Sequence, residues 1–275
     1  MIASLREALG SRELLVHLTL RELRTKYRRS ILGWGWSLLN PIVLVIVYTF
    51  VFSVVLKVTP KPGDPSGNHY FAFFLFSAIL PWNFLTNGIQ VSTGAIMSSR
   101  PLITKVYFPR EQIVFAAIGS LLVTLLVEMF VLQVALAAFR YPAIKYLPMV
   151  MVLMVLETVF VTGLGLFISA MSVRHRDIPY LTSVVLTVWF YVTPVLYSID
   201  RISEKHKMFG VTIPLKDIMM ANPMARFVAA YRDCLYHLKW PDAGTLIYLV
   251  VLSVIAFIGG YIYFVDRAKY FAEDL

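Results

Sequence analysis

The chain has 275 residues, enough for one large or two small soluble domains, but 59% of them are hydrophobic and only 15% are charged. Soluble domains carry about 25% charged residues, and the mean hydropathy of this chain is +0.73. The composition argues against a soluble enzyme and indicates a membrane protein. The net charge of +9 suits basic residues held on one side of a membrane near anionic lipid, so we expect no nucleic-acid partner.

The sequence gives little support for disulfide or metal chemistry. Cys234 is the single cysteine, so it forms no intramolecular disulfide and no cysteine cluster. The five histidines are scattered, without a His-Glu-x-x-His motif or a pair four residues apart. We predict that this chain binds no metal and no cofactor and has no catalytic residues.

The segment before residue 38 has the spacing of an amphipathic helix. Its apolar positions recur at steps of four, three and four residues, at Val16, Leu20, Leu23 and Tyr27. Its basic positions recur at the same steps about 100° further round, at His17, Arg21, Arg24 and Arg28. We predict a helix lying flat on the cytoplasmic surface. Its basic face either anchors lipid headgroups or receives a phosphorylated substrate head or a partner protein.

A bilayer core of about 30 Å requires about 20 apolar residues at 1.5 Å rise per residue. Six runs of about that length are bounded by charges or by Pro and Gly. They are Leu38–Leu56, Tyr70–Val91, Gln112–Phe139, Leu147–Val173, Ile178–Ile199 and Thr245–Val265. We therefore predict an all-α membrane protein with six transmembrane helices. Residues 1–37 form a cytoplasmic segment, 38–265 the transmembrane domain and 266–275 a cytoplasmic tail.

The distribution of Lys and Arg predicts the orientation in the membrane. With both termini on one side, the segments on that side hold 14 Lys and Arg, whereas the two short loops on the other side hold 4. Basic residues are retained on the cytoplasmic side, so both termini are predicted to be cytoplasmic. Residues 200–244 place 7 more basic residues outside, but long loops follow this rule less closely.

The long loop before the last span contains an apolar stretch of its own. Ile218–Tyr231 covers about one leaflet and is interrupted at Asn222 and Pro223. Asn222 is predicted to cap the second of two helices, and Pro223 to begin it. We predict a re-entrant helical pair over about residues 213–238, with a short helix on the outer surface as the alternative.

Five motifs resemble those of one transporter family. The segment that leads into the first span, residues 27–41, reads Tyr-Arg-Arg-Ser-Ile-Leu-Gly-Trp-Gly-Trp-Ser-Leu-Leu-Asn-Pro. The other motifs lie at residues 102–111, 174–178 and 189–197, and at the pairs 222–223 and 231–232. In this order and spacing the chain resembles ABC-2 type permeases that export O-antigen, capsule, teichoic acid or galactan. The resemblance implies a transport subunit and not an enzyme.

The resemblance also implies a partner that supplies energy. This chain has no Gly-x-x-x-x-Gly-Lys-Ser/Thr loop for nucleotide phosphates, so two copies of a separate ATPase would bind ATP and magnesium. In the family, the loop at about residues 98–110 forms a coupling helix that contacts this ATPase. The contact residues implied here are Lys105, Tyr107, Phe108, Pro109 and Arg110. Arg174 and Asp177 form either a second contact or a charged stop between two spans.

The substrate implied by the resemblance is a polyprenyl-pyrophosphate-linked polysaccharide in the bacterial cytoplasmic (inner) membrane. Arg21, Arg24, Arg28 and Arg29 are assigned to its pyrophosphate, and Trp189, Tyr191 and Tyr197 to the channel lining, where aromatic faces would stack on sugar rings. Six helices make a narrow path for a glycan, so we expect a homodimer with the pathway on its two-fold axis. An ABC-2 exporter of a drug or small lipid is the nearest alternative.

Two acidic residues support a different class of transporter. Glu128 and Glu157 lie near the middle of predicted spans, where a carboxylate must be paired, protonated or facing water. A proton-coupled flippase would use them to bind its coupling proton. The sequence shows no evident inverted repeat of the kind common in secondary transporters, so we interpret both acids as hydrogen-bonding groups within the bundle.

Overall fold

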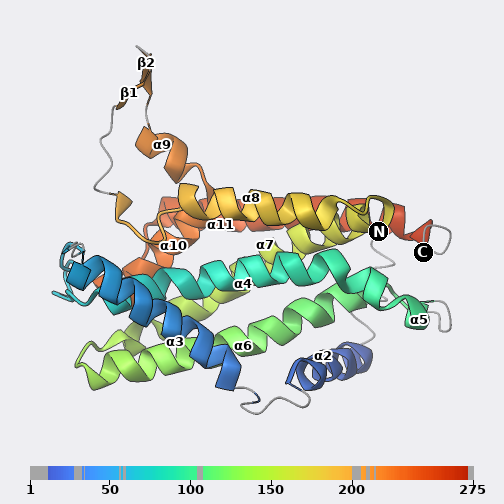
Figure 1. Cartoon of the computed structure of the whole chain (residues 1–275), viewed down its shortest axis with the longest axis horizontal. Coiled ribbons are helices and arrows are strands. Elements are labelled where there is room, and N and C mark those ends of the chain that lie inside the picture. Colours follow the sequence, from blue (N-terminus) through green and yellow to red (C-terminus); the bar gives the residue numbers. More distant parts are fainter. Residues whose placement is uncertain are drawn as a thin grey trace.

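The computed structural model describes residues 12–27, 33, 35–55, 57, 60–103, 108–199, 206–208, 211–213 and 215–271, and most of them are helical. Four long helices run side by side along the long axis of the molecule (Figure 1). They are α4 (Phe71–Ser98), α6 (Glu111–Ala138), α7 (Leu147–Arg174) and α11 (Ala243–Ala268). These four helices are long and apolar enough to cross a membrane. The 3-10 turn η2 (Ala143–Tyr146) extends α7 at its start.

Two further apolar helices are shorter than these four. The first, α3 (Gly35–Thr49), continues into the π-helical turn η1 (Phe50–Val55). The second, α8 (Ile178–Val192), has 15 residues, which rise only about 23 Å. The predicted fifth span extended to Ile199, but the helix ends at Val192 because Thr193 is extended before Pro194. Of the six predicted spans, four therefore correspond to helices long and apolar enough to cross a membrane, and the other two correspond to shorter apolar helices.

Small residues bring the long helices into close contact. Gly163 of α7 packs directly against the backbone of α11 at Ala256 and Gly260, and a Cβ atom on either glycine would clash with the facing helix. On another face of α7, Gly165 lies against Ser92 of α4. Small side chains are the usual means of close packing between membrane helices. These contacts therefore hold the four-helix bundle together within one chain.

The N-terminal helix α2 (Arg12–Tyr27) packs along the first half of α6. Leu18 is buried there, and Thr19 faces Gly119 of α6. Val16 and Leu20, which belong to the predicted apolar face, are instead 54% and 42% exposed. The helix thus has three faces about 100° or more apart: one on the bundle, one apolar and exposed, and one basic. The sequence periodicity predicted the last two and missed the first.

A compact group of short elements closes one end of the bundle. It comprises α9 (Leu215–Met220), α10 (Pro223–Arg232) and the π-helical turn η4 (Asp233–His237). Phe227, Tyr231 and Cys234 of this group are fully buried, with α10 packed on α4, α7 and α11. As predicted, Asn222 caps α10, accepting a hydrogen bond from Met224 N at 3.0 Å, and Pro223 begins the helix.

The chain also contains a feature that an all-α prediction missed. The strands β1 (His206–Met208) and β2 (Val211–Ile213) pair as an antiparallel ribbon in the long loop before α9. It projects from the same end of the molecule as α10, which is called the α10 end below; the opposite end holds α5 (Arg100–Ile103) and is called the α5 end (Figure 1). A strand pair of three residues each is too short to show a clear alternating pattern in the sequence.

Candidate functional site

The centre of the α10 end is a buried arginine, Arg232. Its Nη1 donates to the carbonyl of Pro194 and its Nη2 to that of Val195, each at 2.6 Å. Nη1 also reaches the Tyr197 carbonyl at 3.3 Å, and the guanidinium lies 3.7 Å from the centre of the Phe74 ring. One side chain therefore links α10 to α4 and to the segment that follows α8. In the sequence Arg232 belongs only to the motif at residues 231–232, and no local signal predicts its bonds to carbonyls 37 and 38 residues away.

Asn222 makes a second link between α10 and α8. Its Oδ1 accepts from Trp189 Nε1 at 2.7 Å, and its Nδ2 donates to Thr193 Oγ1 at 2.9 Å. The same Oδ1 caps α10, so both the oxygen and the nitrogen of the side-chain amide form hydrogen bonds. The Trp189 ring also meets Trp82 of α4 edge-on, with 6.2 Å between ring centres.

The three aromatics assigned to the channel lining therefore differ in their surroundings. Trp189 is half-buried and hydrogen-bonded to Asn222, as described above. Tyr197 is also half-buried, and its hydroxyl donates to the Tyr191 carbonyl at 3.0 Å. Tyr191 itself is 68% exposed. Of the three, Tyr191 is the one with most of its ring free to meet a ligand.

The two intramembrane acids also have different surroundings. Glu157 of α7 is fully buried, and its Oε2 accepts a hydrogen bond from Tyr231 of α10 at 2.9 Å. Glu128 of α6 is half-buried and lines a cavity of about 290 Å³ shared with α3 and α4. The structure thus gives Glu157 a bundle-packing role of the predicted kind, linking α7 to α10.

At the α5 end, the last residue of the predicted coupling loop, Arg110, and the start of α6 are bonded to α11 and the residues that follow it. Arg110 donates to the Ala268 carbonyl and lies 5.9 Å from the ring centre of Phe271. Its neighbour Glu111 accepts from Tyr261 of α11 at 3.1 Å. Phe108 and Pro109 are half-buried beside these contacts, whereas the predicted contact residues Lys105 and Tyr107 lie outside the described residues.

The turn between α7 and α8 presents charges at the same end. Arg174, Arg176 and Asp177 are all exposed. Within the described part of the chain, Arg174 and Asp177 form neither an ion pair nor a side-chain hydrogen bond, and Asp177 does not cap α8 through its side chain. The charges of this turn therefore face outward, which is compatible with both predicted roles, a second contact and a charged stop between two spans.

The basic face of α2 lines a hollow. Arg21, Arg24 and His17 border a cavity of about 530 Å³ together with Leu20 and Thr25. Arg21 is partly neutralised by Glu22, whose carboxylate lies 2.8 Å away. The other two arginines assigned to the substrate headgroup, Arg28 and Arg29, lie outside the described residues.

Comparison with known proteins decides the family. The sequence pattern of the ABC-2 type transporters matches residues 13–236. This chain belongs to the ABC-2 type transporter family. The match includes α2, the coupling segment and α10, and ends within η4.

Named relatives of this ABC-2 transporter chain extend over nearly all of it. An O-antigen export system permease protein from Myxococcus xanthus is 30% identical over the full length of both chains. One of the same description from Klebsiella pneumoniae is 26% identical over 90% of this chain and 86% of its own. A polysialic acid transport protein from Escherichia coli is 20% identical over 88% of this chain and 89% of its own.

Proposed function

We propose that this chain is the permease subunit of an exporter that moves a lipid-linked cell-envelope polysaccharide across the bacterial cytoplasmic membrane. The observation that carries the proposal is the 30% identity, over the whole of both chains, to a protein described as an O-antigen export permease. The likeness to a polysialic acid transport protein supports a polymeric substrate over a drug or small lipid. The ATP and magnesium would be bound by a separate ATPase in two copies.

In this proposal, all six apolar helices cross the membrane, with both termini in the cytoplasm. The short α8 would complete its crossing with residues 193–197, whose carbonyls are bound by Arg232. Two copies of the chain would form the pathway. The exposed apolar face of α8, which carries Tyr180, Val184, Val188 and Tyr191, supports a place for α8 at the contact between copies or at the pathway.

The proposed mechanism assigns different tasks to the two ends. ATP-driven closure of the ATPase pair would push on the coupling segment, with Lys105, Tyr107 and Phe108 as contacts and the exposed charges of residues 174–177 beside them. Arg110 would pass this motion to α11 through Ala268. At the other end α8 and α10 would move as one unit, because Arg232 and Asn222 tie them together.

The substrate would enter beside α2. The hollow lined by Arg21, Arg24 and His17 supports binding of a pyrophosphate, since guanidinium groups pair well with phosphate oxygens. Arg28 and Arg29 would extend the same basic surface. Alanine replacement of Arg21 and Arg24 is expected to lower export while the permease still assembles with its ATPase.

The experiment that tests the function is co-expression with the ABC-type ATPase encoded beside it. We expect a complex of two permease and two ATPase chains. The double change Arg174→Glu and Arg176→Glu should release the ATPase, whereas Lys145→Glu, at the opposite end, should not. Deletion of the permease should remove the surface polysaccharide and leave lipid-linked polymer inside the cell.

Two results would contradict the proposal. One is the absence of any associated ATPase after gentle extraction. The other is export that survives ATP depletion but fails in Glu128→Gln or Glu157→Gln, as expected of a proton-coupled flippase.

A further inference from the structure

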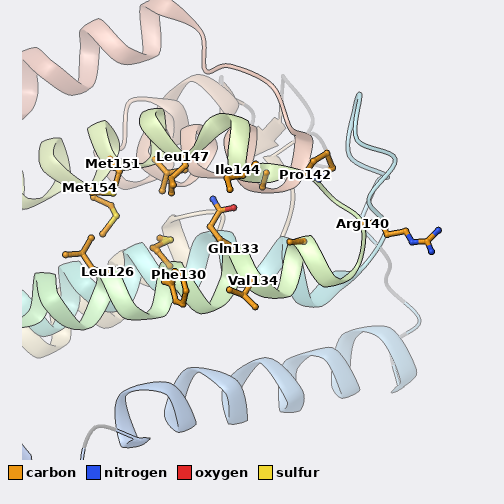
Figure 2. A pocket seen from close by; sticks show the side chains of 14 residues that line it. Leu126, Phe130, Gln133, Val134, Arg140, Pro142, Ile144, Leu147, Met151 and Met154 are labelled. Carbon is orange, nitrogen blue, oxygen red and sulfur yellow. The ribbon is translucent and has the colours of Figure 1, made fainter.

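An apolar groove lies between α6 and α7 at the α10 end of the bundle (Figure 2). Its volume is about 660 Å³. Both helices that form it belong to the four that can cross a membrane. Its walls include Phe130 and Ile144, whose side chains are 68% and 74% exposed. Within a bilayer such a groove faces the hydrocarbon core, so lipid acyl chains are the groups that can fill it.

The groove has a cation at its mouth. Arg140 has a positive φ of 65° in the turn that ends α6, where its own N–H donates to the Ala137 carbonyl. Its guanidinium forms no ion pair or hydrogen bond within the described part of the chain. Figure 2 shows this side chain extended outward past the end of the two helices, and in a membrane a long basic side chain in such a place reaches toward the headgroups.

Deeper in the groove lies one uncharged polar side chain, Gln133 of α6. Figure 2 shows it reaching from α6 toward α7, among Phe130, Val134 and Leu147. Its Nε2 atom is buried and has no hydrogen-bond partner among the described residues. Burying an amide N–H group costs free energy unless it donates to an acceptor. The terminal torsion of glutamine rotates readily, so the side-chain amide of Gln133 can turn toward an acceptor in the groove.

We propose that this groove binds one anionic glycerophospholipid. Its phosphate lies at Arg140, an ester carbonyl accepts a hydrogen bond from Gln133, and an acyl chain fills the space down to Leu126 and Met154. The lengths agree: Leu126 and Ala138, the last residue of α6, are twelve helical residues apart, about 18 Å, and Arg140 follows in the turn, which matches one leaflet of about 15 Å of hydrocarbon plus its interface. A polyprenyl phosphate has no ester carbonyl and leaves Gln133 unsatisfied.

The test is lipid binding to the full chain purified in detergent, measured by native mass spectrometry during titration with phosphatidylglycerol. The wild type should retain one molecule. Ala137→Phe, which fills the groove, should abolish this binding, and Lys145→Gln, a neighbouring cation outside the groove, should preserve it. An unchanged adduct in Ala137→Phe would overturn the proposal, provided that the variant elutes as a single species and keeps its helical circular dichroism.

A second comparison tests the hydrogen bond itself. Gln133→Leu should weaken binding of phosphatidylglycerol about fivefold, the effect of one hydrogen bond. A diether analogue, which lacks both ester carbonyls, should bind the wild type about as weakly and should show no further loss with Gln133→Leu. Independent, multiplicative losses would overturn the assignment of Gln133.

The headgroup is tested in the same way. Arg140→Gln should reduce the preference for phosphatidylglycerol over diacylglycerol, and high salt should mimic this change. If diacylglycerol binds the wild type as well as phosphatidylglycerol does, the assignment of Arg140 is wrong. Preferential retention of a polyprenyl phosphate would overturn the choice of a glycerophospholipid.

Discussion

The α10 residues Arg232 and Asn222 and the charged turn between α7 and α8 use their polar side chains in opposite ways. At the α10 end, Arg232 and Asn222 are directed inward and bind backbone carbonyls and neighbouring side chains. At the α5 end, Arg174, Arg176 and Asp177 face outward. Hydrogen bonds between elements of the same chain hold an end of the bundle together. An end that binds a partner protein needs charged side chains that are not already paired within the chain. This difference supports the α5 end as the ATPase contact in the proposed function.

The largest effect on stability should come from Arg232→Met. This change leaves the buried carbonyls of Pro194 and Val195 without their donor, with an expected loss of about 3–5 kcal/mol of unfolding free energy. Thermal unfolding in detergent, followed by size-exclusion chromatography, measures it. Arg174→Met at the other end is the matched control and should change stability by less than about 0.5 kcal/mol. Equal losses would show that the two ends do not differ as described.

Arg232→Lys sharpens the same comparison. A lysine has no planar fork with which to reach two carbonyls at once, so we expect it to recover less than half of the stability lost in Arg232→Met. Full recovery would mean that the positive charge, and not the geometry of the guanidinium, holds α8 to α10.

A smaller loss is expected from Asn222→Ala, which removes both a helix cap and the bonds to Trp189 and Thr193. Loss of an N-cap alone costs about 1 kcal/mol, so about 1–2 kcal/mol is expected in the same unfolding assay. Asn222→Asp keeps the acceptor for Met224 and Trp189 but loses the donor to Thr193, and its stability should lie between wild type and alanine.

The smallest of these effects is expected from Tyr231→Phe. Its hydroxyl bonds Glu157, and hydrogen bonds between membrane helices average only about 0.6 kcal/mol in double-mutant cycles. The cycle with Glu157→Met, which removes the acceptor, should give a coupling energy of about 0.6 kcal/mol in unfolding experiments. A coupling near zero would leave Glu157 without a structural role and would make it the first candidate for proton binding.

How far the sequence predicts this structure depends on the kind of signal. The long apolar runs located α4, α6, α7 and α11, and the Asn-Pro pair placed the start of α10 correctly, because both signals are local. The face of α2 that packs on α6 was not predicted. Leu18 and Thr19 lie beside the longer apolar stripe of the same helix, and the sequence of α2 alone does not show that Gly119 of α6 packs against Thr19.

The site residues follow the same rule. The resemblance assigns Trp189 to the channel lining, whereas in the structure its indole donates to Asn222, which lies 33 residues away in the chain. Likewise, the resemblance assigns Arg110 to a contact with a partner protein, whereas in the structure it donates a hydrogen bond to the Ala268 carbonyl. A sequence shows which side chains can form hydrogen bonds, whereas the choice between an internal and an external partner is made by the tertiary fold.

The burial of Cys234 has a practical consequence. This only cysteine lies in η4 with none of its surface exposed, and burial, with a smaller contribution from Asp233, raises the pKa of its thiol to about 12. A thiol that is both enclosed and protonated does not react with maleimides. The native chain therefore gives no background labelling, and a cysteine that replaces Arg174 or Lys145, which are exposed at opposite ends of the bundle, reports which side of the membrane each end faces.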